Sequence, residues 1–380
     1  MTAPAAPAWR HHAATLAGQL TSTAPAWHDA VAATPRHLLV PRWWEEVAPG
    51  PVFGVVVPDE PRLLDAAYSD TTLITRLGPH HADLTDPARR VTGPPTSSAT
   101  LPGLIVDLLD HLDVHDSHRV LDVGTGSGYS AALLAHRLGD DQVTSIDVDD
   151  YLVQAARDRL ASFDRHPHLH TVDATGPLPG GDYDRILATV SVRPVPATWL
   201  AALRPGGRLL TTIAHTPLLV TATARGDGTA TGHVIDRTAR FMTTRHDTTY
   251  PPRLDDLWQQ ARDTDGDTIA DTTTPLPDLF TDWPLATLIE LTQPGIEHRS
   301  ATIDGHPVLW LLHHDGSWAR VEDTGTTRRA HQTGPRNLWN LVEHVIQRRD
   351  DQPFPLHQLT VDITPDTTTL TAPTGWRFAL

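Results

Sequence analysis

Short apolar runs alternate with amphipathic helical patterns between residues 118 and 214, and this alternation constrains the fold more than any other feature. Runs of strand length occur at 118–123, 142–147, 169–174, 183–190 and 206–214. Helical patterns separate them at 129–138, 151–163 and 196–203. Strands that alternate with helices are typical of a parallel sheet covered on both faces. Two apolar runs joined by a GDG turn follow at 218–236, so we expect an α/β domain whose sheet ends in antiparallel strands.

The composition excludes several classes of protein. The chain has 380 residues, of which 39% are hydrophobic and 20% charged, so we expect a soluble, globular protein of two or three domains. It contains no cysteine, which excludes disulfides, thiolate nucleophiles and cysteine–zinc sites. Lysine is also absent, which excludes Schiff-base chemistry and a P-loop lysine. The formal net charge of −16 argues against a nucleic-acid partner, which needs a basic surface.

The sequence predicts neither a membrane span nor a secretory signal. No apolar run approaches the roughly 18 residues that a span requires. The N-terminal stretch lacks the basic flank and continuous apolar segment of a secretory signal. The cytoplasm is therefore the expected location, with no membrane partner.

The two flanking regions have weaker patterns. Before the alternating segment, helical patterns occur at 9–20, 26–33 and 104–112, and an extended run occurs at 50–58. The stretch 76–102 is rich in glycine and proline and predicts a loop. After the alternating segment, we expect a polar loop at 264–278, a hairpin at 306–322 that turns at Asp315-Gly316, a helix at 337–349, and a strand pair at 357–364 and 369–376.

A glycine-rich loop follows the first strand of the alternating segment, in the sequence VLDVGTGSGY. It contains Asp122, Gly124, Gly126 and Gly128, whereas a dinucleotide fingerprint would need glycine at Tyr129. Methyltransferases that use S-adenosylmethionine place such a loop after their first strand. The glycines let the backbone approach the amino-acid part of the cofactor, and the aspartate can meet its ammonium group directly or through water.

Acidic residues follow the next two strands in the positions that such a cofactor needs. Asp147, next to Val148, ends the second strand about 20 residues after the loop, where an acid can accept hydrogen bonds from ribose hydroxyls. Asp173 and Ala174 end the third strand, where they can contact the adenine edge. A lone glycine loop is also consistent with a simple tight turn, but these companions favour a cofactor site. The predicted cofactor contacts are Asp122, Gly124, Thr125, Gly126, Gly128, Tyr129, Asp147, Val148, Asp173 and Ala174.

Residues 30–245 resemble the protein-L-isoaspartate O-methyltransferases. The matching stretches are TPRHLLVP (Thr34–Pro41), AYSD (Ala67–Asp70), the glycine loop, and the segment 183–210. The resemblance implies a Rossmann-like class I S-adenosylmethionine methyltransferase with a mostly parallel seven-stranded sheet, plus a C-terminal α+β extension. It implies S-adenosyl-L-methionine as cofactor and carboxyl O-methylation as activity. We predict an N-terminal helical and loop region beside the active site (1–95), a cofactor-binding domain (96–247) and the extension (248–380), which we expect to recognise a peptide.

The same resemblance implies a catalytic hydroxyl. The family carries a Ser-x-Pro pattern before its first sheet-covering helix, and here Thr100-Leu101-Pro102 occupies that position, preceded by Ser97 and Ser98. We therefore predict that Thr100 and Ser98 lie near the reacting carboxylate. Thr100 could instead, or in addition, cap the helix that begins near Pro102. The stretch between AYSD and these hydroxyls is longer than usual, which predicts a longer loop over the site.

The extension resembles a subfamily from peptide natural-product biosynthesis, in the stretches GSWARVE, GPRNLWNLVEHVI, LTVDITPD and PTGW. This implies methylation of an aspartate in a ribosomally made, cross-linked precursor peptide of the graspetide or lanthipeptide type, with cyclisation of the ester to aspartimide. The alternative is a protein-L-isoaspartate O-methyltransferase that repairs isoaspartyl residues in damaged proteins. A catalytically inactive binding protein is a third reading. The sequence does not reveal the oligomeric state.

The chemistry needs no general base, because a peptide carboxylate is already ionised near neutral pH. The enzyme must exclude water and align the reacting groups, and a hydroxyl can bind one carboxylate oxygen while the other attacks. Arginines could attract the substrate carboxylate or be ordinary surface ion pairs. The candidates are Arg36, Arg193, Arg328, Arg329 and Arg336.

Two further sets of residues invite a functional interpretation that we do not favour. His166, His168 and His170 alternate, but no carboxylate or cysteine pattern accompanies them, so we expect no metal site. Four tryptophans of the extension could line a peptide groove, although packing in the core is the favoured use. They are Trp310, Trp318, Trp339 and Trp376.

Overall fold

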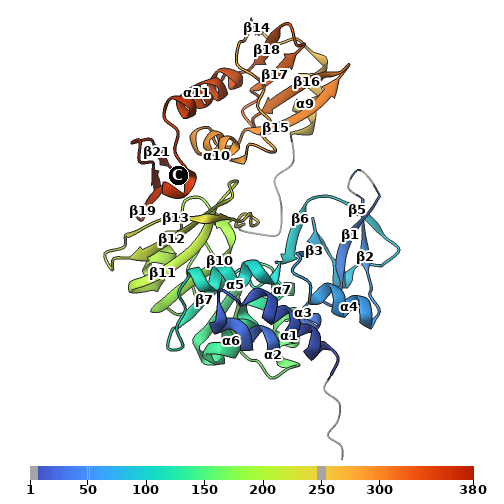
Figure 1. Cartoon of the computed structure of the whole chain (residues 1–380), viewed down its shortest axis with the longest axis vertical. Coiled ribbons are helices and arrows are strands. Elements are labelled where there is room, and N and C mark those ends of the chain that lie inside the picture. Colours follow the sequence, from blue (N-terminus) through green and yellow to red (C-terminus); the bar gives the residue numbers. More distant parts are fainter. Residues whose placement is uncertain (1–6, 49, 51, 246–253) are drawn as a thin grey trace, which may run out of the picture. The chain divides into compact units, whose positions relative to one another are not determined.

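The computed structural model describes residues 7–48, 50, 52–245 and 254–380, and the chain divides into two compact units (Figure 1). Unit 1 comprises Met1–Ala214, Leu218–Tyr250 and Val361–Thr368. Unit 2 comprises His215–Pro217, Pro251–Thr360 and Thr369–Leu380. The predicted N-terminal region 1–95 therefore shares one unit with residues 96–214 of the predicted cofactor-binding domain (96–247), and the predicted boundary at 247/248 lies outside the described residues.

Unit 1 is built on a mixed sheet with strand order β13-β12-β11-β10-β7-β8-β9. The strands are β7 (Val120–Val123), β8 (Val143–Asp147), β9 (His168–Thr171), β10 (Tyr183–Val192), β11 (Leu203–Ile213), β12 (Leu218–Ala224) and β13 (Ala230–Thr238). The pairs from β9 to β11 are parallel, and those joining β11, β12 and β13 are antiparallel. The elements predicted between 118 and 236 are all present. The sheet is longer than the seven strands expected, because β19 (Thr360–Ile363) follows β13 in it.

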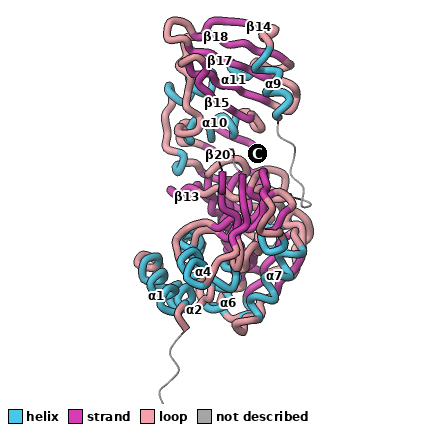
Figure 2. Tube along the Cα trace, turned by 90° about the vertical axis from the view of Figure 1, so that its right-hand side faces the viewer, coloured by secondary structure: helices cyan, strands magenta, loops and turns pink. Residues whose placement is uncertain are grey.

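Helices lie on both sides of these strands (Figure 2). The helix α5 (Pro102–His111) precedes the alternating segment, whose helices are α6 (Tyr129–Leu138), α7 (Asp150–Ala161) and α8 (Ala197–Ala202), with a 3₁₀ turn η3 (Asp140–Gln142). The N-terminal helices are α1 (Trp9–Leu20), η1 (Pro25–Trp27), α2 (His28–Ala33), α3 (Arg36–Leu39) and α4 (Glu60–Ala67). Leu16, Trp27, Leu108 and Leu133 belong to one apolar cluster, so the N-terminal helices share their core with the sheet-covering helices.

A second sheet in unit 1 corrects the prediction of a loop at 76–102. Its strands are β1 (Trp43–Ala48), β2 (Val52–Val56), β3 (Leu73–Leu77), β4 (His80–His81), β5 (Arg90–Thr92) and β6 (Pro95–Ala99), with a 3₁₀ turn η2 (Ala82–Leu84). β6 pairs antiparallel with β3, with Leu73 opposite Ala99 and Ile74 opposite Ser98. The loop prediction was wrong because backbone pairing across the sheet overrides the local turn preference of glycine and proline. The stretch after AYSD is therefore sheet rather than a long loop.

Unit 2 contains an antiparallel sheet of order β14-β18-β17-β16-β15. Its elements are α9 (Asp255–Asp263), β14 (Thr268–Asp271), α10 (Trp283–Thr292), β15 (Glu297–Ile303), β16 (His306–Leu312), β17 (Trp318–Asp323), β18 (Arg328–Thr333), α11 (Leu338–Asp351), η4 (Leu356–Gln358), β20 (Thr368–Thr371) and β21 (Arg377–Ala379). The predicted hairpin and helix are confirmed. The loop predicted at 264–278 contains edge strand β14, which forms by pairing with β18, and β21 was not predicted.

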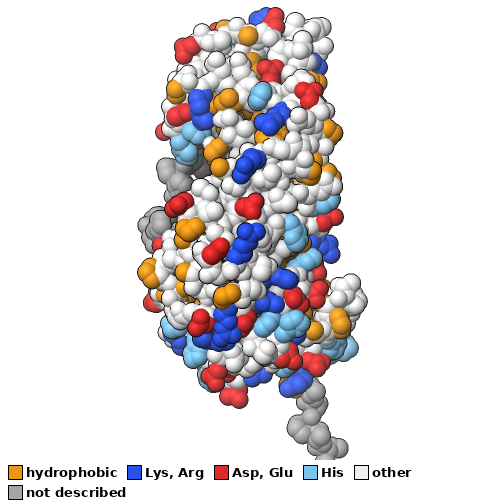
Figure 3. Space-filling view, turned by 90° about the vertical axis from the view of Figure 1, so that its left-hand side faces the viewer, with side chains coloured by type: hydrophobic (Ala, Val, Ile, Leu, Met, Phe, Trp, Pro, Cys, Tyr) orange, Lys and Arg blue, Asp and Glu red, His pale blue; other side chains and the backbone are white. Residues whose placement is uncertain are grey.

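The tryptophans of the extension are core residues. Trp310, Trp318 and Trp339 are each 1% exposed and Trp376 is 3% exposed, so the interpretation as a peptide groove is wrong. At the surface, basic and acidic side chains are interspersed on the face shown in Figure 3. No helix among the described residues combines the length and the apolar character that crossing a bilayer requires.

Candidate active site

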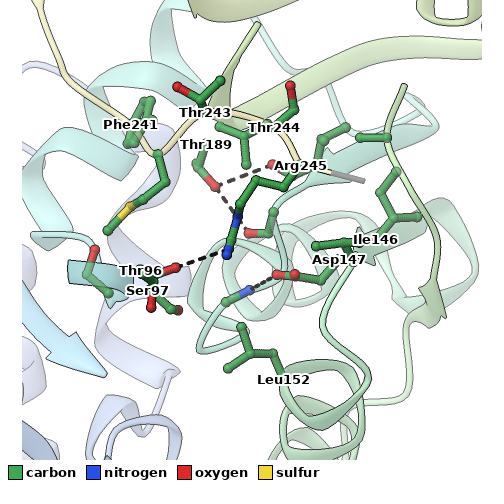
Figure 4. Close-up of a pocket in the computed structure, with 18 of the residues that line it drawn as sticks. Thr96, Ser97, Ile146, Asp147, Leu152, Thr189, Phe241, Thr243, Thr244 and Arg245 are labelled. Atoms are coloured by element: carbon green, nitrogen blue, oxygen red, sulfur yellow. Dashed lines mark hydrogen bonds between the residues drawn. The ribbon is translucent and has the colours of Figure 1, made fainter. Parts of the chain in front are cut away.

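A pocket in unit 1 lies at the carboxyl ends of β7, β8 and β10 (Figure 4). The space between its walls, open solvent included, is about 710 Å³. Its lining comes from residues in six segments, at 96–100, 123–126, 146–152, 172–174, 189–190 and 241–245. The carboxyl edge of a parallel sheet is where ligands of α/β proteins bind.

The glycine loop presents bare backbone to this pocket. Gly124 has φ +98°, and a Cβ atom there would lie 2.9 Å from Thr189 Oγ1 and 3.1 Å from Val190 Cγ1. The amides of Gly124 and Thr125 donate to Ile146 O at 2.8 and 3.0 Å, which holds the loop against the end of β8. Only glycine fits at position 124, and because no side chain covers the main chain there, a ligand can approach it closely.

Asp147 connects the loop to the next strand end. Its carboxylate accepts hydrogen bonds from Gly126 N at 3.0 Å and from Asp149 N at 3.1 Å. Burial raises the pKa of Asp147 above its usual value, and these two amide bonds oppose that shift. Asp147 lines the pocket, so its carboxylate is placed to accept hydrogen bonds from a ligand hydroxyl.

Asp122 supports the loop from within the protein rather than lining the pocket. It is fully buried, and its Oδ2 accepts a hydrogen bond from Ser145 Oγ at 2.7 Å. Burial raises the pKa of Asp122 to about 6, with the Ser145 bond acting in the opposite direction. Ser130 also lowers this pKa, although none of the described residues makes a direct hydrogen bond to Asp122 Oδ1. A buried acceptor beneath the loop fits a ligand that brings an ammonium group, directly or through water.

Residues 98–100, the hydroxyl segment that carries Ser98 and Thr100, face the glycine loop across the pocket. Ser98 and Thr100 are half-buried and line the pocket, and neither hydroxyl is hydrogen-bonded within the described residues. A Cβ atom on Gly126 would lie 3.6 Å from Ser98 O, so a side chain at this position would be in van der Waals contact with the segment. Both hydroxyls are available to a ligand bound at the loop.

The alternative role of Thr100 as a helix cap is wrong. The N-cap position of α5 is Leu101, which makes no capping bond through its side chain. Asp70 Oδ1 instead accepts from Gly103 N at 2.6 Å, and Thr72 Oγ1 accepts from Leu101 N at 3.2 Å. Asp70 and Thr72 thus accept hydrogen bonds from amides at the start of α5 and leave the Thr100 hydroxyl to the pocket.

Arg36 holds the hydroxyl segment in place and does not line the pocket. Its side chain is 0% exposed, and burial lowers the pKa of its guanidinium. Nη1 donates to Ala67 O at 2.7 Å, and Nη2 donates to Ala99 O at 3.4 Å and to Thr100 O at 3.2 Å. The guanidinium carbon also lies 5.5 Å from the centre of the Tyr129 ring, at the start of α6. Arg36 therefore connects the hydroxyl segment to α6, the helix that follows the glycine loop.

The other candidate arginines lie elsewhere. Arg193 does not line the pocket. Three lie in unit 2, where each pairs with a carboxylate of its own unit: Arg328 with Asp323, Arg329 with Asp271 and Arg336 with Asp315. For these three, ordinary ion pairing is the better interpretation. Within the described ranges, no group of three or more histidine, aspartate or glutamate side chains is placed to hold a metal ion.

The structure brings part of the predicted site together. The predicted residues that line the pocket are Ser98, Thr100, Gly124, Gly126, Asp147, Val148 and Ala174. Those that do not are Asp122, Thr125, Gly128, Tyr129 and Asp173. Gly128 packs towards Ala156 as the left-handed residue before α6, and Tyr129 is buried under Arg36. The Asp173 carboxylate accepts hydrogen bonds from the amide and hydroxyl of Thr175, at 2.8 and 2.7 Å.

Sequence reasoning missed one wall of the pocket, formed by Phe241 to Arg245. This segment follows β13 and runs beside the end of β10, where Ser191 N donates to Met242 O and Thr244 N donates to Ser191 O, each at 2.9 Å. The contact joins residues about 50 positions apart, and no local pattern in the segment indicates it.

Residues 79–244 match the family described as protein-L-isoaspartate(D-aspartate) O-methyltransferase. A protein-L-isoaspartate O-methyltransferase of Methanopyrus kandleri is 35% identical over 113 residues, which cover 29% of this chain and 50% of that protein. One of Azorhizobium caulinodans is 37% identical over 114 residues, covering 30% of this chain and 52% of that protein. The chain thus spans about half the length of the curated relatives it matches. This region is related to a family of carboxyl methyltransferases that use S-adenosylmethionine.

The fold agrees with this relationship. A solved structure named protein-L-isoaspartate O-methyltransferase superimposes with a TM-score of 0.53 at 17% identity, covering 96% of this chain and 99% of that chain. The region that matches this family, residues 79–244, lies in a unit with the class I S-adenosylmethionine methyltransferase fold.

Proposed function

We propose that this protein is an S-adenosylmethionine-dependent methyltransferase that esterifies the carboxylate of an isoaspartyl residue in a peptide or protein. The observation that carries the proposal is the pocket itself, where the hydroxyls of Ser98 and Thr100, to which none of the described residues is hydrogen-bonded, face a bare glycine loop next to Asp147. The similarity of residues 79–244 to the isoaspartate methyltransferases supports the same substrate.

The residues present fit the cofactor. S-adenosylmethionine, when bound, supplies an electrophilic methyl group. Asp147 would accept hydrogen bonds from its ribose hydroxyls, and the backbone at Gly124 and Gly126 would border its amino-acid part. The buried acceptor of Asp122 would favour its ammonium group. Val148 and Ala174, at the ends of β8 and β9, would border the adenine.

The chain's own residues would then align and desolvate the acceptor. An isoaspartyl carboxylate is ionised near neutral pH, so no residue has to remove a proton. Thr100 or Ser98 would donate to one carboxylate oxygen and leave the other directed at the methyl group. Charge is neutralised as the ester forms, so exclusion of water by Phe241, Met242 and Leu152 would favour the reaction.

The second candidate substrate is an aspartate in a cross-linked precursor peptide, whose methyl ester would cyclise to aspartimide. What favours it is unit 2, which has its own antiparallel sheet and lies almost wholly beyond the matched residues 79–244. Its quoted stretches resemble the extension of peptide-modifying methyltransferases. The cofactor chemistry is the same for both candidates, so only the peptide distinguishes them.

Mass spectrometry of methylated peptides tests both candidates. The purified chain is incubated with S-adenosylmethionine and one of three substrates: a short isoaspartyl peptide, its aspartyl isomer, or a cross-linked precursor. We expect the mass increase of one methyl group on the isoaspartyl peptide and not on its isomer. Asp147→Asn is the matched variant, because it keeps the side-chain volume and removes the charge that faces the cofactor site.

Each outcome separates the candidates. Methylation of the precursor alone, followed by loss of methanol, would support the aspartimide-forming activity and reject the isoaspartyl one. Transfer to neither substrate, with S-adenosylhomocysteine still bound in calorimetry, would reject both substrates while retaining the cofactor. Absence of cofactor binding would reject the proposed function as a whole.

A further inference from the structure

The first turn of α7 is held by a cross-strand pair from the second sheet of unit 1. Arg76 on β3 and His81 on β4 lie opposite each other in the antiparallel register, so their side chains project from the same face of the sheet. Arg76 Nη1 lies 3.3 Å from Asp149 Oδ2, and His81 Nε2 lies 3.1 Å from the same oxygen. Asp149 is the N-cap residue of α7, where its Oδ1 accepts a hydrogen bond from Tyr151 N at 3.1 Å. One carboxylate therefore joins the second sheet to the start of this helix.

These three groups are largely shielded from water. Arg76 is 3% and Asp149 5% exposed, and the side chain of His81 is 10% exposed. Burial acts to raise the pKa of Asp149, but the His81 and Arg76 contacts outweigh it, and the pKa lies below its usual value. Asp149 is therefore charged in the folded protein. A buried ion pair is weak evidence for stability, because loss of hydration offsets the attraction, so the location of this one is its more informative property.

Asp149 also borders Asp147, the acid that we assign to the cofactor ribose. The Asp149 amide donates to Asp147 Oδ1 at 3.1 Å, and Gly126 N donates to Asp147 Oδ2 at 3.0 Å (Figure 4). Two amides that bind different oxygens fix the plane of the carboxylate. A carboxylate oxygen can accept two hydrogen bonds, so an amide bond to each oxygen is compatible with a further bond from each ribose hydroxyl. A shift of the Asp149 main chain would turn the Asp147 carboxylate out of this orientation.

A second contact between the same elements reinforces this arrangement. Asp83, in η2 directly after β4, accepts hydrogen bonds from Tyr151 Oη at 3.0 Å and from Arg159 Nη2 at 2.6 Å, and both donors belong to α7. The ring centres of His81 and Tyr151 lie 4.4 Å apart. The second sheet therefore holds α7 at its first and third turns, so loss of one contact should displace the start of the helix rather than unfold it.

We propose that Arg76 and His81 are positioning residues for the ribose-binding acid, Asp147, on which they act through the start of α7. This deepens the proposed function and rests on it. The backbone of Arg76 is paired on both sides, with His81 on β4 and with Ser97 on β6, and Ser97 lines the pocket. The second sheet presents the acceptor hydroxyls through β6, and by this proposal it also orients the cofactor acid.

The test measures binding of S-adenosylhomocysteine and of its 2′-deoxy analogue to the full chain by calorimetry. The native chain should prefer S-adenosylhomocysteine by about 10- to 100-fold, as for a hydrogen bond to a charged group. Arg76→Met should reduce this preference to about threefold or less, while the affinity for the 2′-deoxy analogue stays within about threefold of native. Arg76→Lys restores the cation and should recover part of the preference. Arg62→Met is the matched control, because Arg62 forms an exposed ion pair with Glu45 of the same sheet, and it should change neither affinity.

A double-mutant cycle tests whether Arg76 acts through Asp147. Asp147→Asn alone should also remove the preference for S-adenosylhomocysteine. Addition of Arg76→Met to that variant should then change the affinity by less than about threefold, because the acid to be oriented is already gone. His81→Leu keeps the ion pair between Arg76 and Asp149 and should lower the preference by a smaller factor. This variant decides the question if Arg76→Met does not fold.

The outcomes separate positioning from a purely structural role. Equal weakening of both compounds, or additive effects in the cycle, would overturn the proposal. No preference in the native chain, or a preference that survives both Arg76→Met and His81→Leu, would also overturn it, and methylation of an isoaspartyl peptide would then leave the proposed function intact. If the preference and its loss are seen but no isoaspartyl peptide is methylated, the proposed substrate is wrong and the assignment of Arg76 and His81 stands.

Discussion

Replacement of Arg36 by methionine is the most demanding test of how the site is held. The substitution keeps an unbranched side chain of moderate length and removes the buried guanidinium. The bonds lost go to the carbonyls of Ala67, Thr71, Ala99 and Thr100, at 2.7, 3.3, 3.4 and 3.2 Å. We expect the free energy of unfolding of unit 1 to fall, because buried carbonyl groups are left without donors.

The expected decrease in the free energy of unfolding follows from these four hydrogen bonds. A hydrogen bond to a charged group contributes about 1.5–3 kcal/mol, and the three bonds longer than 3.1 Å count for less than the bond to Ala67. Removal of a guanidinium whose pKa is lowered by burial returns part of the loss. The net decrease should be about 2–4 kcal/mol, which corresponds to a fall in Tm of about 5–15 °C for a unit of this size.

Differential scanning calorimetry of the full chain measures this effect. Arg240→Met is the control, since Arg240 is exposed, and it should shift Tm by less than about 1 °C. Arg36→Lys should lie between the two, because a lysine can serve fewer of the four carbonyls. A decrease below about 1 kcal/mol for Arg36→Met, or full recovery in Arg36→Lys, would refute the reasoning that the guanidinium network holds the hydroxyl segment.

Three further predictions concern the cofactor loop and the hydroxyl. Gly124→Ala should destabilise unit 1 by about 2–5 kcal/mol, because φ is positive and the added Cβ would lie 2.9 Å from Thr189. Gly139→Ala, where φ is also positive but nothing lies within 4 Å, should destabilise it by about 1–2 kcal/mol. Equal losses of stability in urea unfolding would contradict the close contact at Gly124. Asp122 has its pKa raised to about 6, so its charged form opposes folding above that pH, and the opposition disappears below its ordinary pKa. Asp122→Asn should therefore raise the free energy of unfolding by up to about 3 kcal/mol near pH 8 and by little near pH 4. The native chain should lose affinity for S-adenosylhomocysteine as pH falls through about 6. If neither the stability difference between the variant and the native chain nor this affinity depended on pH, the buried charge would be contradicted. Thr100→Val should lower kcat/KM about 10- to 100-fold while Thr100→Ser retains most of it, and equal activity of both variants would remove the hydroxyl from the mechanism.

Local periodicity accounts for the parts of the fold that were predicted well. The α6 pattern was placed at its observed bounds, Tyr129–Leu138, because apolar residues recur at helical spacing and glycines flank both ends. The strands β7 and β8 were found for a related reason, since short apolar runs bounded by polar residues are buried in a parallel sheet. Asp147 could be placed at the pocket because its position in sequence, at the end of a strand, already fixes the edge of the sheet.

Long-range pairing explains the errors. β6 was taken for loop because its residues, Pro95–Ala99, have no alternating apolar pattern, and it is a strand through its bonds to β3. The ring of Tyr129, a residue that we predict to contact the cofactor, lies beneath Arg36, which is more than 90 residues earlier in the chain. Neither contact has a local signature, because each depends on a partner whose position is set by the rest of the fold.

The sequence by itself determined the α/β architecture, the glycine loop and the acid after the second strand, since these depend on helical and strand periodicity and on the freedom of glycine. Only the tertiary structure decided how the site is completed. It assigned helix capping to Asp70, 33 residues before Gly103, and so left the Thr100 hydroxyl to the pocket. It also brought Arg245 to within a hydrogen bond of Thr96, 149 residues away. Such contacts arise because burial and strand pairing act on the whole chain at once, beyond the few residues over which a sequence pattern extends.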